Sequence, residues 1–214
     1  MLAINTAFMT ANLALETKDG KIATQMLDAK CKHSENVLQK IDEMCEKLGT
    51  EVTDVGTVAV VVGPGSFTGL RIGVSIAKAL GCANKDTKFV ALSSLELMAY
   101  IYAKSHKTND EFVCVLNALS DLYFIAKFDK NGTKIEDEKM IEKSEFERIT
   151  EKKIGLDGDL NKTLADDFIT IESTDLLSFA KTKENGGEYV SLEDLLPVYL
   201  RPSQAEANLN SKIS

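Results

Sequence analysis

The chain has 214 residues, and 44% of them are hydrophobic, which is enough for one or two domains with buried cores. Its 33 acidic and 25 basic side chains give a net charge of −8. This charge argues against the broad basic surface that nonspecific nucleic-acid binding requires, although a local basic patch is compatible with it.

The sequence carries no sign of a membrane segment. Its first residues, MLAINTAFMTANLALE, lack a basic flank and alternate like a strand rather than like a signal peptide. No apolar run approaches the roughly 20 residues that are needed to span a bilayer. We therefore expect a cytoplasmic protein that does not bind membranes.

The cysteines and histidines offer little material for a metal site. No two cysteines form a CxxC pair, and the two histidines, His33 and His106, lie far apart in the sequence. Each cysteine has apolar or helical neighbours, which is typical of buried, reduced thiols. The four cysteines are Cys31, Cys45, Cys82 and Cys114.

The first hundred residues predict a three-strand meander followed by alternating helices and strands. Asp19-Gly20 is the expected hairpin turn of the meander. Ser34 is the expected N-cap of the first helix and Gly49 its stop, and Ser93-Ser94 caps the last helix. The expected strands are 2–6, 12–17, 21–27, 57–62 and 88–92, and the expected helices are 35–48, about 70–83 and about 94–103.

The meander recurs later in the chain. Asn5 and Asn117 are 112 residues apart, and so are the hairpin pairs Asp19-Gly20 and Asn131-Gly132. This spacing indicates a duplicated unit, the alternative being two meanders that look alike by chance. We predict a first lobe of residues 1–103 and a second lobe of residues 104–190. The second lobe is expected to contain helices near 144–150 and 174–183, short apolar runs at 154–156 and 168–171, and a loop at 184–187.

Residues 191–214 form the predicted C-terminal segment. Its apolar stretch LEDLLPVYLR would be exposed unless it packed back onto the body of the protein. We expect this packing for the stretch itself and a frayed tail after it.

The stretch VVVGPGSFTGLRIG, residues 60–73, resembles a phosphate-binding loop but matches neither common motif. Five residues separate Gly63 from Gly69, where a Walker A loop needs four, and Thr68 stands where a dinucleotide fingerprint needs glycine. An anion at the helix N-terminus is one hypothesis. The other is a tight turn in which Thr68 caps the helix and Arg71 pairs with an acidic neighbour. The residues alone favour neither. Those available to an anion or nucleotide are Gly65, Ser66, Phe67, Thr68, Gly69 and Arg71.

The helix after this loop is apolar around more than half of its circumference. Arg71, Ser75 and Lys78 form one narrow polar stripe, whereas Gly73, Ala77 and Gly81 form a groove of small residues. One interpretation is a central helix buried within its own lobe. The sharper one is a helix that packs against both the sheet and a partner protein.

The chain resembles the TsaB (YeaZ) family, relatives of TsaD. The resemblance covers nearly the whole sequence and is carried by LAINTA near the N-terminus, His33-Ser34-Glu35, GPGSFTGLRIG, LSSLE at 92–96 and PVYLR at 197–201. It implies an α/β protein with duplicated actin/Hsp70-like (ASKHA, ribonuclease H-like) lobes, each a mixed sheet with flanking helices.

The resemblance also implies a function. The family supports formation of N6-threonylcarbamoyladenosine at position 37 of ANN-decoding tRNAs. TsaD carries the metal and transfers the threonylcarbamoyl group, whereas TsaB-like chains are non-catalytic scaffolds and activators. The implied partners are TsaD in a heterodimer, the ATPase TsaE in a ternary complex, a second copy when the chain is alone, and tRNA only indirectly.

The family's partner surface corresponds to the first two long helices. We expect no catalytic residue, no metal ligand and no tightly bound cofactor, with any ATP or ADP only at the complex interface. The partner-binding candidates are Glu35, Leu38, Asp42, Cys45, Leu70, Gly73, Val74, Ala77 and Gly81.

Two asparagines depart from the family pattern. Asn5 and Asn117 stand where acidic residues are usual, and a neutral amide is a poor partner for Mg²⁺. ATP hydrolysis by this chain alone is therefore not expected. The alternative function is a nucleotide-binding ATPase, with Asp121 as a poor acidic substitute, or a glycoprotease-like metallopeptidase. The latter would need more than the lone His33.

Overall fold

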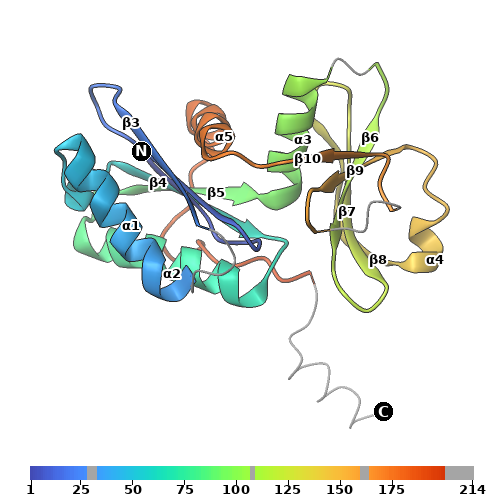
Figure 1. The fold of residues 1–214 in the computed structure, drawn as a ribbon, viewed down its shortest axis with the longest axis horizontal. Coiled ribbons are helices and arrows are strands. Elements are labelled where there is room, and N and C mark those ends of the chain that lie inside the picture. Colours follow the sequence, from blue (N-terminus) through green and yellow to red (C-terminus); the bar gives the residue numbers. More distant parts are fainter. Residues whose placement is uncertain (28–32, 107–108, 160–163, 201–214) are drawn as a thin grey trace, which may run out of the picture.

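The computed structural model describes residues 1–27, 33–106, 109–159 and 164–200. Figure 1 shows two sheets side by side, with helices on their faces. The first sheet has the order β3-β2-β1-β4-β5, in which the first three strands are antiparallel and β4 and β5 run parallel to β1. Its strands are β1 Leu2–Asn5, β2 Ala11–Glu16, β3 Ile22–Leu27, β4 Thr57–Gly63 and β5 Lys88–Ser93.

Two long helices cover one face of this sheet. Helix α1 spans His33–Leu48, a short 3-10 turn η1 spans Val52–Asp54, and α2 spans Phe67–Ala83. Gly49 ends α1 as predicted. Its φ of +67° is a left-handed conformation that glycine adopts more easily than other residues, and it lets the Thr50 N–H donate to the Cys45 carbonyl at 3.1 Å. The helix begins at His33, two residues before the predicted start.

The second sheet repeats the first. Its order is β10-β9-β6-β7-β8, and its pairing directions match those of β5-β4-β1-β2-β3. The strands are β6 Phe112–Asn117, β7 Leu122–Phe128, β8 Lys134–Glu142, β9 Lys152–Leu156 and β10 Asp167–Ile169. Helix α4 spans only Lys143–Phe146, shorter than the predicted 144–150. This arrangement confirms the predicted duplicated actin-like fold.

The hairpins confirm the 112-residue repeat in detail. Gly20 has a φ of +82° and its N–H donates to the Thr17 carbonyl, whereas Gly132 has a φ of +81° and donates to the Asp129 carbonyl. Both donor–acceptor distances are within the normal range, at 3.0 and 2.9 Å. Two hairpin turns with the same backbone conformation and hydrogen bond, 112 residues apart and each joining antiparallel strands, are not expected by chance.

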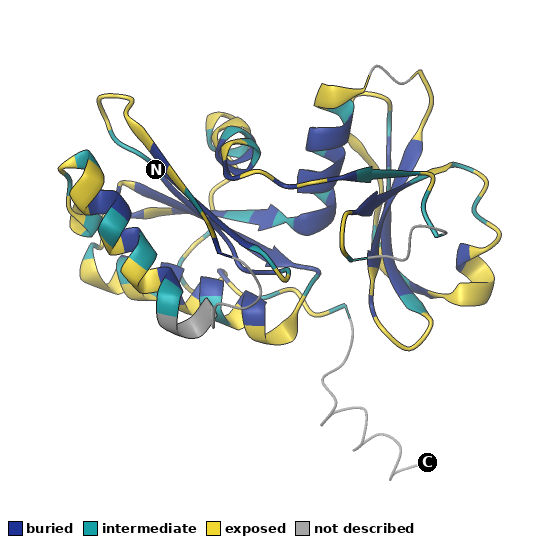
Figure 2. Cartoon of the chain, in the orientation of Figure 1, coloured by how far each residue is buried: buried dark blue, intermediate teal, exposed yellow. Residues whose placement is uncertain are grey.

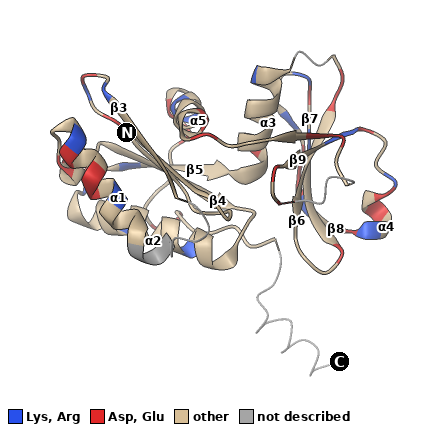
Figure 3. Ribbon diagram, viewed as in Figure 1, with Lys and Arg blue, Asp and Glu red and all other residues tan. Residues whose placement is uncertain are grey.

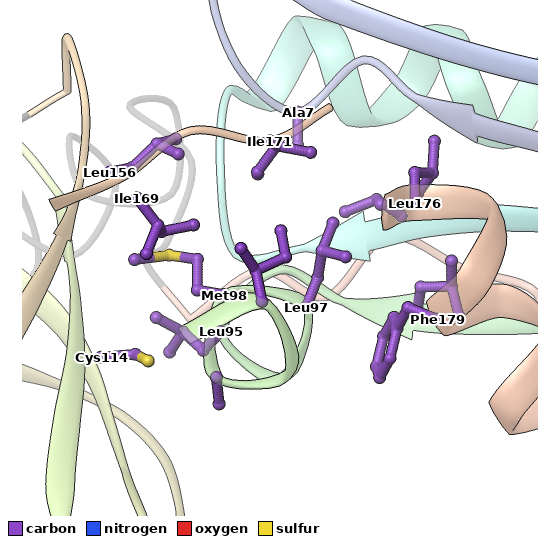
Figure 4. Close-up of a cluster of buried hydrophobic side chains, with 14 of the residues drawn as sticks. Ala7, Leu95, Leu97, Met98, Cys114, Leu156, Ile169, Ile171, Leu176 and Phe179 are labelled. Carbon is purple, nitrogen blue, oxygen red and sulfur yellow. The ribbon is translucent and has the colours of Figure 1, made fainter. Parts of the chain in front are cut away.

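Each lobe ends in a helix that packs across to the other lobe. Helix α3, Ser94–Ser105, follows β5 but lies against β6, β7, β9 and β10 as well as β4 and β5. Helix α5, Ser173–Asn185, follows β10 but lies against β1, β2 and β3. One continuous buried cluster joins both sheets through these helices, and Figure 4 shows Leu95, Met98 and Leu176 within it.

Helix α5 was predicted, at 174–183, within the second lobe, yet its apolar face meets the first sheet. An amphipathic pattern identifies the buried face of a helix but not the sheet that covers it, so the sequence could not show that α5 packs on the first lobe. The helix also runs on to Asn185, into the predicted loop at 184–187. The domain boundaries at 103 and 190 stay predictions.

Residues 189–200, here called the strap, run back along the first lobe. Val190 pairs with Phe89 beside β5, Leu195 is fully buried, and the Val198 N–H donates to the Val62 carbonyl at 2.8 Å. In the predicted stretch LEDLLPVYLR, Leu195 is buried and Leu192 and Leu200 pack partly on the body, whereas Leu196, Val198 and Tyr199 are exposed. The predicted frayed tail and Arg201 lie outside the described residues.

The predicted burial of the cysteines is right for two of them and wrong for one. Cys45 and Cys114 are buried, and burial raises the pKa of both thiols. Cys82 is exposed near the end of α2, and Cys31 lies outside the described residues. Within the described part of the chain, no helix is both long and apolar enough to cross a membrane.

Candidate functional site

The glycines of the loop between β4 and α2 permit close backbone packing. A Cβ atom on Gly69 would lie 1.9 Å from the Thr6 carbonyl oxygen, and one on Gly65 would lie 2.8 Å from the Ala7 carbonyl oxygen. Both distances are far below contact distance, so neither position has room for a side chain. The loop therefore packs tightly on the segment that follows β1.

Two of the backbone N–H groups at the start of α2 have partners within the protein. The Ser66 N–H donates to the Ala7 carbonyl at 2.8 Å, and the Gly69 N–H donates to the Ser66 hydroxyl at 3.3 Å. Ser66, rather than the expected Thr68, is therefore the N-cap of α2. Anion binding by Gly65, Ser66, Phe67, Thr68, Gly69 and Arg71, which the structure brings together at the start of α2, stays a prediction.

Asn5 is engaged in structural hydrogen bonds. It is fully buried, its Oδ1 accepts the Ala7 N–H at 3.0 Å, and its Nδ2 donates to Asn12 Oδ1 at 3.4 Å. Asn12 in turn donates to the Ile171 carbonyl at 2.9 Å, which ties β2 to the segment before α5. A buried amide with these partners does not fit the hydrated Mg²⁺ of an actin-like ATPase.

Asn117, the equivalent residue of the second lobe, is exposed. Its Oδ1 accepts the Leu119 N–H at 2.8 Å, and its own N–H donates to Asp159 Oδ2 at 2.7 Å. Burial raises the pKa of Asp159, and this hydrogen bond opposes the rise. Asp121, the substitute acid considered for an ATPase, lies on the surface 4.0 Å from Lys143. The described residues contain no cluster of three or more His, Cys, Asp or Glu side chains able to hold a metal ion.

A pocket of about 330 Å³ opens between the two lobes. Apolar side chains contribute much of its lining, with Asp157 and Asp159 at one side. A pocket of this composition lacks the cationic groups that phosphates require among its described lining residues. Those residues are Phe8, Met9, Thr10, Asn12, Met26, Leu156, Asp157, Gly158, Asp159, Thr170 and Ile171.

The small-residue groove of α2 faces its own sheet. A Cβ atom on Gly73 would lie 2.6 Å from Thr6 Oγ1 and 3.1 Å from Val60 Cγ2, so a side chain there would clash. A Cβ atom on Gly81 would clash with the ring of Phe89. Six of the predicted partner candidates are buried within the lobe, and their role at a partner interface stays a prediction. These are Cys45, Leu70, Gly73, Val74, Ala77 and Gly81.

The outer faces of α1 and α2 form a different candidate surface, here called the helix groove. Figure 2 shows exposed and half-buried positions along these outward faces, opposite the buried side. Of the predicted partner residues, Leu38 and Asp42 are exposed there, and the side chain of Glu35 lies outside the described residues. The groove has a volume of about 390 Å³ and is lined by Leu38, Phe67, Thr68, Arg71, Ile72, Ser75 and Ile76.

An aromatic stack borders the helix groove. The rings of Phe67 and Tyr199 are stacked at 4.8 Å, and the Arg71 guanidinium lies 4.6 Å from the Phe67 ring centre. Arg71 thus contacts an aromatic ring, where one of the two sequence hypotheses gave it an acidic neighbour. The sequence did not place Ile72, Ile76 or Tyr199 at this site, and it placed Ser75 only on the polar stripe of α2. The phenylalanine beside the polar stripe of α2 was the available signal, since aromatic residues are enriched at interfaces.

Comparison with known proteins places the chain in a family. A family model described as "TsaD: tRNA N6-adenosine threonylcarbamoyltransferase" matches residues 27–177, which is more than half of the chain. The "tRNA threonylcarbamoyladenosine biosynthesis protein TsaB" of Bacillus subtilis is 27% identical over 97% of this chain and 96% of its own length. The chain belongs to the TsaB (YeaZ) family, which is homologous to TsaD.

Further relatives agree with this placement. The Escherichia coli protein of the same name is 33% identical over 46% of this chain and 42% of its own length. The solved structure of YeaZ from Pseudomonas aeruginosa superposes with a TM-score of 0.75 at 21% identity, covering 93% of this chain and 98% of that one. At this identity the likeness concerns the fold alone.

Proposed function

We propose that this chain is a non-catalytic subunit in the formation of N6-threonylcarbamoyladenosine in tRNA and that it activates TsaD by binding it through the helix groove. Family membership supports the pathway, because the curated relatives carry that name. The groove supports the binding role. It is the observation on which the proposal rests, because Leu38 and Phe67 are exposed apolar side chains on its two walls.

The interlobe residues support a scaffold rather than a nucleotide hydrolase. Asn5 replaces an acidic residue, and its amide donates to Asn12 of β2. The Asn12 amide in turn donates to the Ile171 carbonyl in the segment before α5. Helices α3 and α5 share one buried cluster with both sheets, which resists the lobe closure typical of actin-like enzymes. In this proposal the metal and the transfer chemistry belong to TsaD.

The charge of the chain supports an indirect role for tRNA. A net charge of −8 repels the phosphate backbone, and Figure 3 shows acidic residues, in red, along the ribbon of both lobes. We place tRNA contact on TsaD, with TsaE as the third component of the complex. Any ATP or ADP would bind at the interface with TsaD, and the chain alone would form a homodimer in the cytoplasm.

Deletion and complementation test this function. A strain that lacks the gene should lose N6-threonylcarbamoyladenosine from its ANN-decoding tRNAs, as measured by mass spectrometry of tRNA nucleosides, and the wild-type chain should restore it. The purified chain should bind the organism's TsaD and should not hydrolyse ATP with Mg²⁺. Turnover of ATP by the isolated chain would contradict the non-catalytic role, and normal modification in the deletion strain would contradict the function as a whole.

A further inference from the structure

Three side chains from two distant segments form a ladder beside the helix groove. The Tyr199 ring of the strap stacks on the Phe67 ring, with ring centres 4.8 Å apart and an interplanar angle of 30°. The Arg71 guanidinium lies over the same Phe67 ring, 4.6 Å from its centre. Phe67 and Tyr199 are 41% and 42% exposed, so the ladder stands at the surface. The Val198 N–H, which donates to the Val62 carbonyl, anchors the strap beside it.

The Arg71 guanidinium lies over the Phe67 ring, with its central carbon 4.6 Å from the ring centre. A guanidinium that stacks on an aromatic ring keeps its N–H donors in the plane of its edge, where they match the two oxygens of a carboxylate. Among the described residues, no carboxylate forms an ion pair with Arg71, whereas partly buried lysines such as Lys127 and Lys183 each contact two. Arg71 is therefore presented at the surface with its donors available.

We propose that Arg71 is the receptor for an aspartate or glutamate side chain of the protein that docks in the helix groove. This inference rests on the proposed function, which makes TsaD that protein. The groove places apolar walls, from Leu38, Ile72 and Ile76, next to the guanidinium. A segment that fits must present an apolar ridge with a carboxylate beside it, as an amphipathic helix does.

A carboxylate fits Arg71 better than a phosphate does. A phosphate carries more charge and three or more oxygens, and protein sites for it combine several donors. Here the neighbouring N–H groups of Ser66 and Gly69 already donate to Ala7 and to the Ser66 hydroxyl. One guanidinium edge beside an apolar groove matches one carboxylate on a protein surface.

Titration calorimetry with the organism's TsaD tests the inference. Arg71→Gln should weaken binding at least about tenfold and reduce its salt dependence, because it removes a charge pair at an interface. Arg71→Lys should recover only part of the affinity, since lysine lacks the planar fork. The matched control is Lys130→Gln, an equal charge change on an exposed turn of the second lobe, and it should bind like wild type.

The positioning role of the ladder has its own variants. Tyr199→Ala should weaken TsaD binding, whereas Tyr199→Phe should bind TsaD like wild type, because stacking needs the ring and not the hydroxyl. Circular dichroism of each variant should match wild type. If Arg71→Gln binds TsaD like wild type, the inference is wrong while the proposed function stands. If the wild-type chain does not bind TsaD, the proposed function itself is wrong.

Small anions provide the remaining comparison. Inorganic phosphate and ATP, titrated into the isolated chain, should show no binding that depends on Arg71. Binding of either that Arg71→Gln abolishes would overturn the inference in favour of a small-molecule anion site. Loss of a homodimer in Arg71→Gln, with unchanged affinity for TsaD, would overturn it in favour of a second copy as the occupant.

Discussion

Asn5 and Asn117 make the same local hydrogen bond at the ends of β1 and β6. Each side-chain oxygen accepts the N–H of the residue two positions later, at 3.0 Å to Ala7 and 2.8 Å to Leu119. The surroundings differ, because Asn5 is fully buried and Asn117 is exposed. The duplication has kept the turn, and only the first copy has been drawn into the contact between the lobes.

This difference predicts the result of restoring the usual acid. Asn5→Asp would place a carboxylate against Asn12 Oδ1, where the present amide donates. An unpaired buried charge is strongly unfavourable, so the variant should lose stability that worsens as the pH rises above about 4. Urea unfolding at several pH values checks this. Asn117→Asp, the exposed control that keeps its acceptor, should change little. An equally stable Asn5→Asp that hydrolyses ATP would contradict the structural role of Asn5.

The glycine loop predicts a second stability effect. Gly69→Ala would drive a methyl group into the Thr6 carbonyl, and because the obstacle is backbone rather than a flexible side chain, there is little room to relax. We expect a loss of at least about 1–3 kcal/mol in the free energy of unfolding, as for other overpacked sites. Gly56→Ala is the control, since nothing lies within 4 Å of its added Cβ. Equal unfolding midpoints for the two variants would show that the loop is not tightly packed.

A charge network between the lobes predicts a pH effect. Glu96 of α3 contacts Lys134 of β8 at 3.1 Å and Lys183 of α5 at 2.7 Å. Burial favours protonation of Glu96, but the hydrogen bonds from both lysines outweigh it and lower the pKa of Glu96 below its ordinary value of 4.5. The folded chain thus binds this proton less readily than the unfolded chain. The stabilisation is therefore present above pH 4.5 and is lost as the pH falls through the lowered pKa.

Glu96→Gln should accordingly reduce the free energy of unfolding by about 1–3 kcal/mol at neutral pH, as expected for hydrogen bonds to a charged group. The difference from wild type should shrink in acid. Thermal unfolding across this pH range measures it. Glu145→Gln, which breaks the exposed pair with Lys139, should have almost no effect at any pH. A constant deficit for Glu96→Gln at all pH values would exclude the charge of Glu96 as its cause.

The apolar pattern of α2 predicted that the helix is buried, but not what it packs against. Its strong apolar character correctly indicated burial, and the 112-residue repeat correctly indicated two similar lobes. The pattern could not show what covers each apolar face. Gly73 packs against the first sheet and Ala77 is fully buried. The sequence could not show this placement, because the interior of a lobe and an interface select the same small residues. Leu38 was identified because it lies at the edge of the apolar stripe of α1.

Tyr199 shows a second limit. Its contact with Phe67 joins residues that are 132 positions apart, and no local periodicity encodes such a contact. The predicted return of the C-terminal segment indicated that the strap packs somewhere on the body, but not that it ends beside the start of α2. Tertiary placement of a strap without regular secondary structure depends on the surfaces left open by the rest of the fold.

The helix groove predicts a selective effect on binding. Leu38→Asp should weaken TsaD binding by about tenfold or more, because it puts a charge where the partner's apolar side chains would lie, and it should leave stability nearly unchanged at this exposed position. Ile135→Asp, on the exposed strand β8, is the control with equal chemistry and similar exposure. Surface plasmon resonance with immobilised TsaD compares them. Equal losses for both variants would argue for a nonspecific effect of the added charge.

Hydrogen–deuterium exchange of the chain, alone and with saturating TsaD, shows whether TsaD binds at the helix groove. We expect TsaD to slow exchange in the outer turns of α1, at the start of α2 and in the strap near Tyr199, and to leave α4 and β8 unchanged. Protection confined to the interlobe pocket around Met9 and Asp159, with no change in α1 and α2, would contradict binding at the helix groove.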